Sequence, residues 1–200
     1  MKSQRRKTKG TFSLLKEYVE DAFLYIKDSR NYIYSVIGIF IISAIIGFAF
    51  ASKLGFLDTL LKEIISKTAG LTGINLILFI FANNASVAFE GLLFGIVLGI
   101  FPLINSVSNG LVLGYVLAKV YSLSGFSEFW RILPHGIFEL PAIFISLGLG
   151  IKLGASVFSK PARKTFKLRL YNSLKVFFLI VLPLLVVAAT IEGILIIILR

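Results

Sequence analysis

The most unusual chemistry in this sequence lies in residues 133 to 141, where the chain's only histidine and a carboxylate are four residues apart. His135 and Glu139 stand in strongly apolar sequence. A charge in such surroundings is costly unless it is paired or neutralised, so the two residues form a candidate functional site. The residues that interrupt a helical pattern around them are Pro134, Gly136 and Pro141.

The two prolines restrict how this segment can fold. Pro134 suits the first turn of a helix, where its missing N–H is not needed, but Pro141 would clash with the carbonyl of Ile137 in a continuous helix. Either a helix begins at Pro134 and kinks, or residues 134 to 139 are non-helical and a new helix starts near Pro141. Non-helical backbone at membrane depth must be buried in protein or line a wet cavity.

Other ionisable and amide side chains also interrupt apolar segments. Clustering would let them share hydrogen bonds and a proton, so we expect at least His135, Glu139 and Glu192 to face the bundle interior. Two roles stay open for the cluster: a proton relay or polar-substrate site, or a buried polar network that only holds helices together. Its remaining candidate members are Glu90, Asn83, Asn84 and Asn109.

The chain lacks the residues that most kinds of enzyme catalysis require. There is no cysteine, which excludes thiol catalysis and Cys-ligated zinc, and a single histidine without a second ligand cluster argues against other metal sites. No serine stands in a nucleophile-elbow context, and no glycine loop is followed by Lys-Ser or Lys-Thr. We therefore expect no catalytic residue, no metal and no cofactor, and hence no enzyme.

Composition indicates an integral membrane protein of the all-α class. Hydrophobic residues make up 57% of the 200 residues and charged residues only 16%, and the mean hydropathy is +0.91, far outside the range of soluble domains. The formal charge of +11 is concentrated in two clusters rather than spread over a surface that could track a phosphate backbone. We expect no nucleic-acid partner.

The two basic clusters suggest the orientation of the chain. Residues 1 to 32 carry eight Lys/Arg against four acids, and residues 152 to 175 carry seven without an acid. Such clusters mark cytoplasmic segments that face anionic lipid headgroups. We expect residues 1–32 to form a basic cytoplasmic tail with an amphipathic helix, and residues 33–200 to form a single transmembrane domain in the cell membrane.

Periodicity predicts the first elements. Apolar residues recur at helical spacing from residue 11 to 30, which predicts an interfacial anchor or, alternatively, a docking helix for a soluble partner. Residues 33 to 51 carry no charge and can cross the hydrocarbon layer. Residues 54 to 67 alternate apolar and charged side chains, which predicts an amphipathic helix on the outer side.

A long apolar stretch follows from residue 74 to 101. It contains Gly91, Gly95 and Gly99 at four-residue steps, on one helical face. Such a face lets another helix approach closely. We expect close packing within the chain, with a homo-oligomer as the alternative.

The next two apolar segments look short. Pro102 and the polar run 105 to 110 predict the end of the preceding span. This leaves residues 111 to 123, about 20 Å as a helix, and residues 137 to 151. Residues 176 to 199 form a full-length last span with an expected kink at Pro183. For both basic clusters to be cytoplasmic, either both short segments cross or neither does.

We prefer the first possibility. The predicted fold is a polytopic helical membrane bundle of about five spans, two of them short or broken, with N-terminal and external amphipathic helices. The N-terminus is then cytoplasmic and the C-terminus outside. A pair of half-helices is the alternative for the two short segments.

The sequence resembles the stage II sporulation protein M family of multi-spanning membrane proteins over about residues 30 to 200. The residues that carry the resemblance are Asn83-Asn84 with Val87-Ala88-Phe89, Asn109-Gly110, Leu133-Pro134-His135-Gly136 with Glu139-Leu140-Pro141-Ala142, and Glu192. The resemblance implies a scaffold that works with peptidoglycan-remodelling proteins in the membrane, and it implies no established catalytic residue or cofactor. Glu90 lies outside the pattern.

These observations give two functional hypotheses. The first is a membrane scaffold or assembly protein in which the polar cluster holds the helices in register. The second is a transporter or channel for a proton-coupled solute or lipid headgroup that uses the cluster as a midplane site. An intramembrane enzyme ranks third. A water-accessible cavity at His135 and Glu139 would favour transport, and a dry, fully hydrogen-bonded cluster would favour the scaffold.

Overall fold

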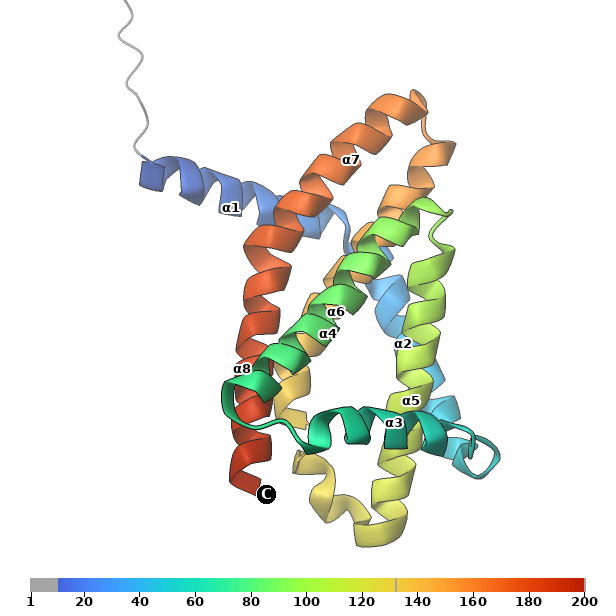
Figure 1. Cartoon of the computed structure of the whole chain (residues 1–200). Helices are drawn as coiled ribbons and strands as arrows, with labels where there is room; N and C mark the ends of the chain where they lie inside the picture. Colours follow the sequence, from blue (N-terminus) through green and yellow to red (C-terminus); the bar gives the residue numbers. More distant parts are fainter. Residues whose placement is uncertain (1–10, 132, 200) are drawn as a thin grey trace, which may run out of the picture.

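The computed structural model describes residues 11–131 and 133–199, and these residues form a helical bundle in which we find no strand (Figure 1). The α-helices of this described part, in chain order, are α1 Thr11–Asp28, α2 Arg30–Ala49, α3 Leu57–Ala69, α4 Gly73–Leu93, α5 Ile100–Ser124, α6 Leu133–Gly154, α7 Ala162–Val176 and α8 Leu182–Leu199.

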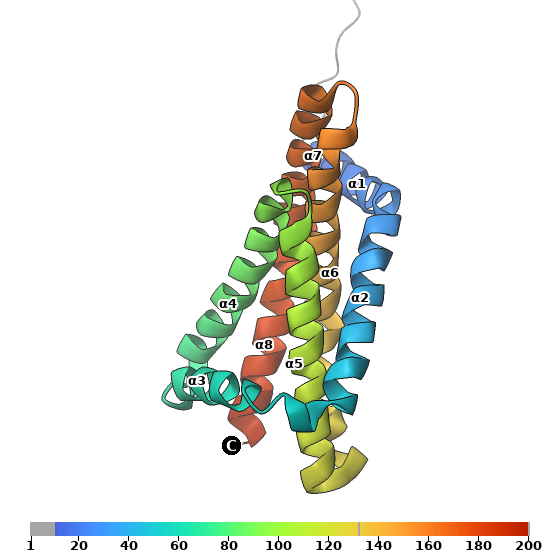
Figure 2. The same cartoon turned by 90° about the vertical axis from the view of Figure 1, so that its right-hand side faces the viewer.

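Five helical segments are long and apolar enough to cross a membrane in the described part of the chain: Arg30–Ala49, Gly73–Ile96, Ile100–Ser127, Gly136–Phe158 and Ala162–Ile198. This confirms the predicted bundle of five spans. Figures 1 and 2 place α1 and α7 at one end of the bundle, here called the α7 end, and α3 with the end of α8 at the other, the α3 end. The two predicted amphipathic segments are helices α1 and α3.

The prediction of two short or broken helices was wrong. Residues 111 to 123 are only the second half of α5, which has 25 residues, and residues 137 to 151 lie inside α6, which has 22. Pro102 does not end a span, because it is the third residue of α5, where no intrahelical partner is needed for its nitrogen. The turn before α5 lies earlier, where Leu98 and Gly99 have φ of 53° and 74°.

Pro134, Pro141 and Pro183 also lie within helical backbone, whereas Pro161 has extended backbone just before α7. α6 begins before Pro134 and runs through Pro141 to Gly154. The possibility of a non-helical segment from 134 to 139 is therefore wrong. A π-helical segment, Phe177–Val181, joins α7 to α8 directly before Pro183, and such a wide turn relieves the contact between a proline ring and the preceding carbonyls.

Glycines let α4 and α6 pack backbone against backbone. A Cβ atom on Gly95 would overlap the carbonyl of Gly150, and one on Gly150 would overlap the carbonyl of Gly91. Gly99 faces the backbone of Ile151. The expected close approach within the chain is confirmed, and a homo-oligomer through the same glycines stays a prediction.

A second close contact joins α2 to α5. A Cβ atom on Gly110 would lie 2.5 Å from the carbonyl oxygen of Phe40, and one on Gly114 would overlap the carbonyl of Ala44. Buried Ser106 donates a hydrogen bond of 3.0 Å to the carbonyl of Val36. The polar run that looked like a loop is thus the α2-facing side of α5.

The main hydrophobic core lies between α4, α6 and α8, and α1 contributes to it. Fully buried Ala22 of α1 belongs to the same cluster as Ala142, Val181 and Leu185, and Tyr25 and Ile26 pack against it. Only the C-terminal half of α1 therefore packs against the bundle at the α7 end, while Leu14, Leu15, Tyr18, Phe23 and Leu24 stay exposed.

Candidate functional site

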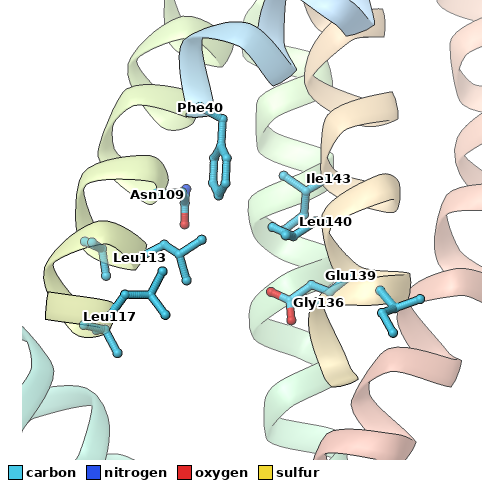
Figure 3. Close-up of a pocket in the computed structure, with 11 residues that line it drawn as sticks. Phe40, Asn109, Leu113, Leu117, Gly136, Glu139, Leu140 and Ile143 are labelled. Atoms are coloured by element: carbon cyan, nitrogen blue, oxygen red, sulfur yellow. The ribbon is translucent and has the colours of Figure 1, made fainter. Parts of the chain in front are cut away.

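A cavity of about 600 Å³ lies between α2, α5 and α6 and includes Glu139 in its wall. Figure 3 shows Asn109, Leu113 and Leu117 of α5 on one side and Glu139, Leu140 and Ile143 of α6 on the other. Only two of the eleven lining residues, Glu139 and Asn109, have polar side chains; the others are Phe40, Val112, Leu113, Val116, Leu117, Gly136, Ile137, Leu140 and Ile143.

The lining residues place the cavity on one side of the bundle. Glu139 is six residues after the first residue of α6, about 9 Å along the helix axis. Phe40 lies at the middle of α2, and the α5 residues run from Asn109 to Leu117. The cavity therefore extends from the middle of the bundle toward the α3 end.

The carboxylate of Glu139 has a second carboxylate near it. Glu192 of α8 lies close enough for the two charges to interact, and both side chains are half-buried. No described side chain donates a hydrogen bond to Glu139. His135 lies in the first turn of α6, one turn before Glu139, but the side chains of His135 and Pro134 are outside the described residues.

Asn109 is held within its own helix. Its side-chain nitrogen donates hydrogen bonds of 2.9 Å to the carbonyl and to the side-chain oxygen of Asn105. The amide oxygen of Asn109 is left to face the cavity wall as an acceptor. The two polar groups of the cavity are therefore an acceptor and a carboxylate, and both favour a donor or a cation.

The other predicted cluster members lie on α4 and do not line this cavity. Asn83 donates a hydrogen bond of 3.3 Å to the amide oxygen of Asn84. Asn83 and Glu90 are exposed on the bundle surface. Glu90 is only three residues from the end of α4, where a carboxylate can reach the headgroup region at modest cost. The structure thus divides the predicted polar residues into a cavity group and an α4 group.

Comparison with known proteins identifies the chain. The profile of Stage II sporulation protein M matches residues 36–195. The chain belongs to this family. The matched region contains every residue of the cavity and leaves out α1 and the basic residues before it.

One curated relative matches part of the chain. An uncharacterized protein of Methanocaldococcus jannaschii is 36% identical over 78 residues, which are 39% of this chain and 33% of the relative. The chain thus matches about a third of the length of that curated relative. No solved structure matches the chain.

A polar contact that sequence reasoning missed joins α3 to α5. Tyr115 donates a hydrogen bond of 2.6 Å from its hydroxyl to Oδ1 of Asp58, and Lys119 lies 3.1 Å from Oδ2. Lys119 also lies over the Tyr115 ring, 5.3 Å from its centroid. The sequence signal for this contact was Lys119, a single lysine in an apolar run. Such a lysine needs a partner near the membrane surface.

This contact predicts a specific effect of Asp58→Asn. The hydrogen bonds from Tyr115 and Lys119 lower the pKa of Asp58 below 3.8. The contact stabilises the ionised carboxylate of Asp58, which is why its pKa is lower in the folded protein. The contact is therefore complete at neutral pH and is lost only as pH falls through that lower pKa. We expect Asp58→Asn to speed amide exchange in α3 about two- to fivefold at pH 7.

Glu63→Gln is the matched control for this measurement. Glu63 pairs with Lys67 at 2.8 Å inside α3 and touches no other helix. Its removal should leave exchange in α3 closer to wild type than Asp58→Asn does. Equal exchange rates for the two variants would show that Asp58 does not hold α3 against α5.

The described residues hold no group of three or more His, Cys, Asp or Glu side chains placed to bind a metal ion. The site is therefore best described by what its cavity offers: an apolar wall with one carboxylate and one amide oxygen.

Proposed function

We propose that this protein is a membrane assembly protein whose cavity receives a transmembrane helix of a partner protein. The observation that carries the proposal is a one-sided, mostly apolar cavity with a carboxylate in its wall. The partner helix would fill the apolar surface with its side chains and bring a lysine, an arginine or another hydrogen-bond donor to Glu139.

The energetics of the carboxylate support a partner of this kind. A carboxylate among leucine and isoleucine side chains is unfavourable without a cation or several donors. Within lipid, helices associate through close packing and through hydrogen bonds between polar side chains. A basic side chain at Glu139 would offset the cost of burying the carboxylate, and the apolar wall would set the register of the two helices.

The shape of the cavity supports docking more than conduction. A transport path must be open to each side in turn and offer polar groups along its length. Here the lining residues lie toward the α3 end, and only Glu139 and Asn109 are polar.

A second candidate is a carrier for an amphipathic amine. The volume of about 600 Å³ falls within the usual range of small-molecule sites, roughly 300 to 1,000 Å³. The amine's ammonium group would pair with Glu139, and its apolar part would pack along Leu113 and Leu117. This candidate predicts a small-molecule or lipid occupant instead of a protein.

We propose that the α7 end faces the cytoplasm. The acid-free basic cluster 152 to 175 lies at that end, together with α1, and positive residues favour the cytoplasmic side. The cavity would then open toward the outer leaflet, and its partner would come from the proteins of the same membrane.

Site-specific photo-crosslinking in the native membrane tests the proposal. A benzoylphenylalanine at position 113, in the cavity, should give a discrete protein adduct, whereas the same group at the exposed Ile45 of α2 should give lipid adducts. Glu139→Gln should reduce the yield of the adduct at position 113 at least about tenfold, because the loss of a charged hydrogen bond weakens binding by about that factor.

Glu90→Gln is the matched control, because it also removes a carboxylate from a spanning helix but lies outside the cavity. It should leave the adduct at position 113 unchanged. If position 113 yields only a small-molecule or lipid adduct that still depends on Glu139, the carrier replaces the assembly protein. Adducts independent of Glu139 contradict both.

A further inference from the structure

The corner where α1, α6 and α7 meet at the α7 end contains two cations, one from α6 and one from α7. Lys152 of α6 donates a hydrogen bond of 2.9 Å to Oγ of buried Ser29 and lies over the Tyr25 ring, 3.9 Å from its centroid. Arg169 of α7 donates a hydrogen bond of 2.5 Å to the carbonyl oxygen of Lys152. We call Tyr25, Ser29, Lys152 and Arg169 the inner corner.

The contacts within the inner corner fix both cations in place. Ser29 donates its own hydroxyl proton to the carbonyl of Tyr25 at 2.6 Å, so it accepts from Lys152 in a set orientation. The hydroxyl of Tyr25 lies 3.5 Å from the carbonyl oxygen of Arg169. Three helices therefore position one ammonium and one guanidinium in advance of any ligand.

The charge of this arrangement is not balanced by the described residues. No described carboxylate lies within salt-bridge distance of Lys152 or Arg169, although Asp28 acts on Lys152 from farther away. An ammonium has three N–H groups and a guanidinium five, and the contacts above use one of each. Two adjacent cations with free donors at a membrane surface form a site for an anion.

We propose that the inner corner binds the phosphate of an anionic membrane lipid. A phosphate can accept from the fork of Arg169 and from Lys152 together, which neutralises both cations. Lys152 is two residues from the end of α6, so the site lies where lipid headgroups lie in a spanning bundle. The exposed cations in α7 and directly before it would attract anionic lipid toward it; they are Lys160, Arg163, Lys164 and Lys167.

The site is independent of the Glu139 cavity. It lies at the opposite end of the bundle and shares no residue with the cavity wall. A lipid at the inner corner would join α1 to α6 and α7, because Tyr25 and Ser29 come from the start of the chain. Failure of this inference would leave the assembly function untouched.

Lipid titration of the purified full-length protein tests the site. Native mass spectrometry should show phosphatidylglycerol bound at least about tenfold more tightly than phosphatidylcholine, as expected for paired charged hydrogen bonds. Lys152→Gln with Arg169→Gln should remove this preference. Lys160→Gln with Arg163→Gln removes the same charge from exposed positions at and just before the start of α7, and should change the preference less than about twofold.

Two further variants keep the test valid if the double variant misfolds. Arg169→Lys keeps the charge but not the fork, and Ser29→Ala keeps every charge but removes the acceptor that orients Lys152. Both should weaken phosphatidylglycerol binding at least about threefold while the protein elutes as wild type. Unchanged binding in both would overturn the site.

Two other outcomes would also overturn it. If the double variant at Lys152 and Arg169 and the double variant at Lys160 and Arg163 lost equal amounts of phosphatidylglycerol binding, the lipid would be attracted by diffuse charge and not by a specific site. Displacement of phosphatidylglycerol by inorganic phosphate at millimolar concentration would mean that the corner takes the free anion and not a lipid.

Discussion

Gly114→Ala should destabilise the helix bundle by at least about 2 kcal/mol, the range expected for overpacking a tight contact. The new methyl group would overlap the backbone carbonyl of Ala44 and come within 2.7 Å of the amide nitrogen of Phe48. A backbone cannot rotate away as a side chain can, so α2 and α5 would have to separate. That separation would also loosen the contact at Gly110.

Gly38→Ala is the control, because it makes the same chemical change in α2 where no atom lies within 4 Å of the new methyl group. Since alanine favours the helix by up to about 1 kcal/mol over glycine, this variant should be as stable as wild type or more stable. Reversible unfolding in mixed detergent micelles measures both. Equal stability of the two variants would mean that α2 and α5 do not pack backbone to backbone.

Leu117→Trp should abolish partner binding while leaving the fold intact. Leu117 lines the cavity, and an indole there would occupy the space proposed for the partner helix. Because the free protein gains contacts instead of losing them, its stability should stay within about 1 kcal/mol of wild type. We expect the protein adduct at position 113 to fall at least about tenfold.

Leu123→Trp is its counterpart on the same helix, at a position 83% exposed and outside the cavity. It should leave the adduct unchanged. A full yield of adduct with Leu117→Trp would show that the partner lies elsewhere, even if the crosslink itself is real.

The class of fold follows from composition because the bilayer allows few choices. Apolar length identified the spans, and the alternation of charged and apolar residues identified α1 and α3. The positions of the two basic clusters required an even number of crossings between residues 105 and 152, which gave five spans. These arguments depend on the lipid environment and not on detailed packing, so they hold although the predicted helix boundaries were wrong.

The boundaries of α5 could not be read because its polar residues face another helix. The run from residue 105 to 110 has the composition of a loop, yet Ser106 hydrogen-bonds to the backbone of α2 and Gly110 contacts Phe40. In a membrane bundle small polar residues mark close helix contacts as often as helix ends. Sequence alone does not distinguish the two uses.

The site was predictable in part for a similar reason. The cost of a carboxylate in lipid singled out Glu139 and suggested Glu192 as its neighbour, and the fold brings the two carboxyl groups near each other. The cavity itself depends on the space that leucine side chains of α5 leave opposite α6. Nor could spacing show that Asn109 would line this cavity while Asn83 and Glu90 would not.

The central claim is that a partner helix brings a cation or donor to Glu139, and the adduct yield at position 113 across a series of Glu139 variants tests it most directly. Glu139→Asp should retain part of the yield, Glu139→Gln should lose most of it, and Glu139→Lys should give no protein adduct. An adduct yield that does not depend on the charge at position 139, or an adduct that contains no protein, would contradict the account.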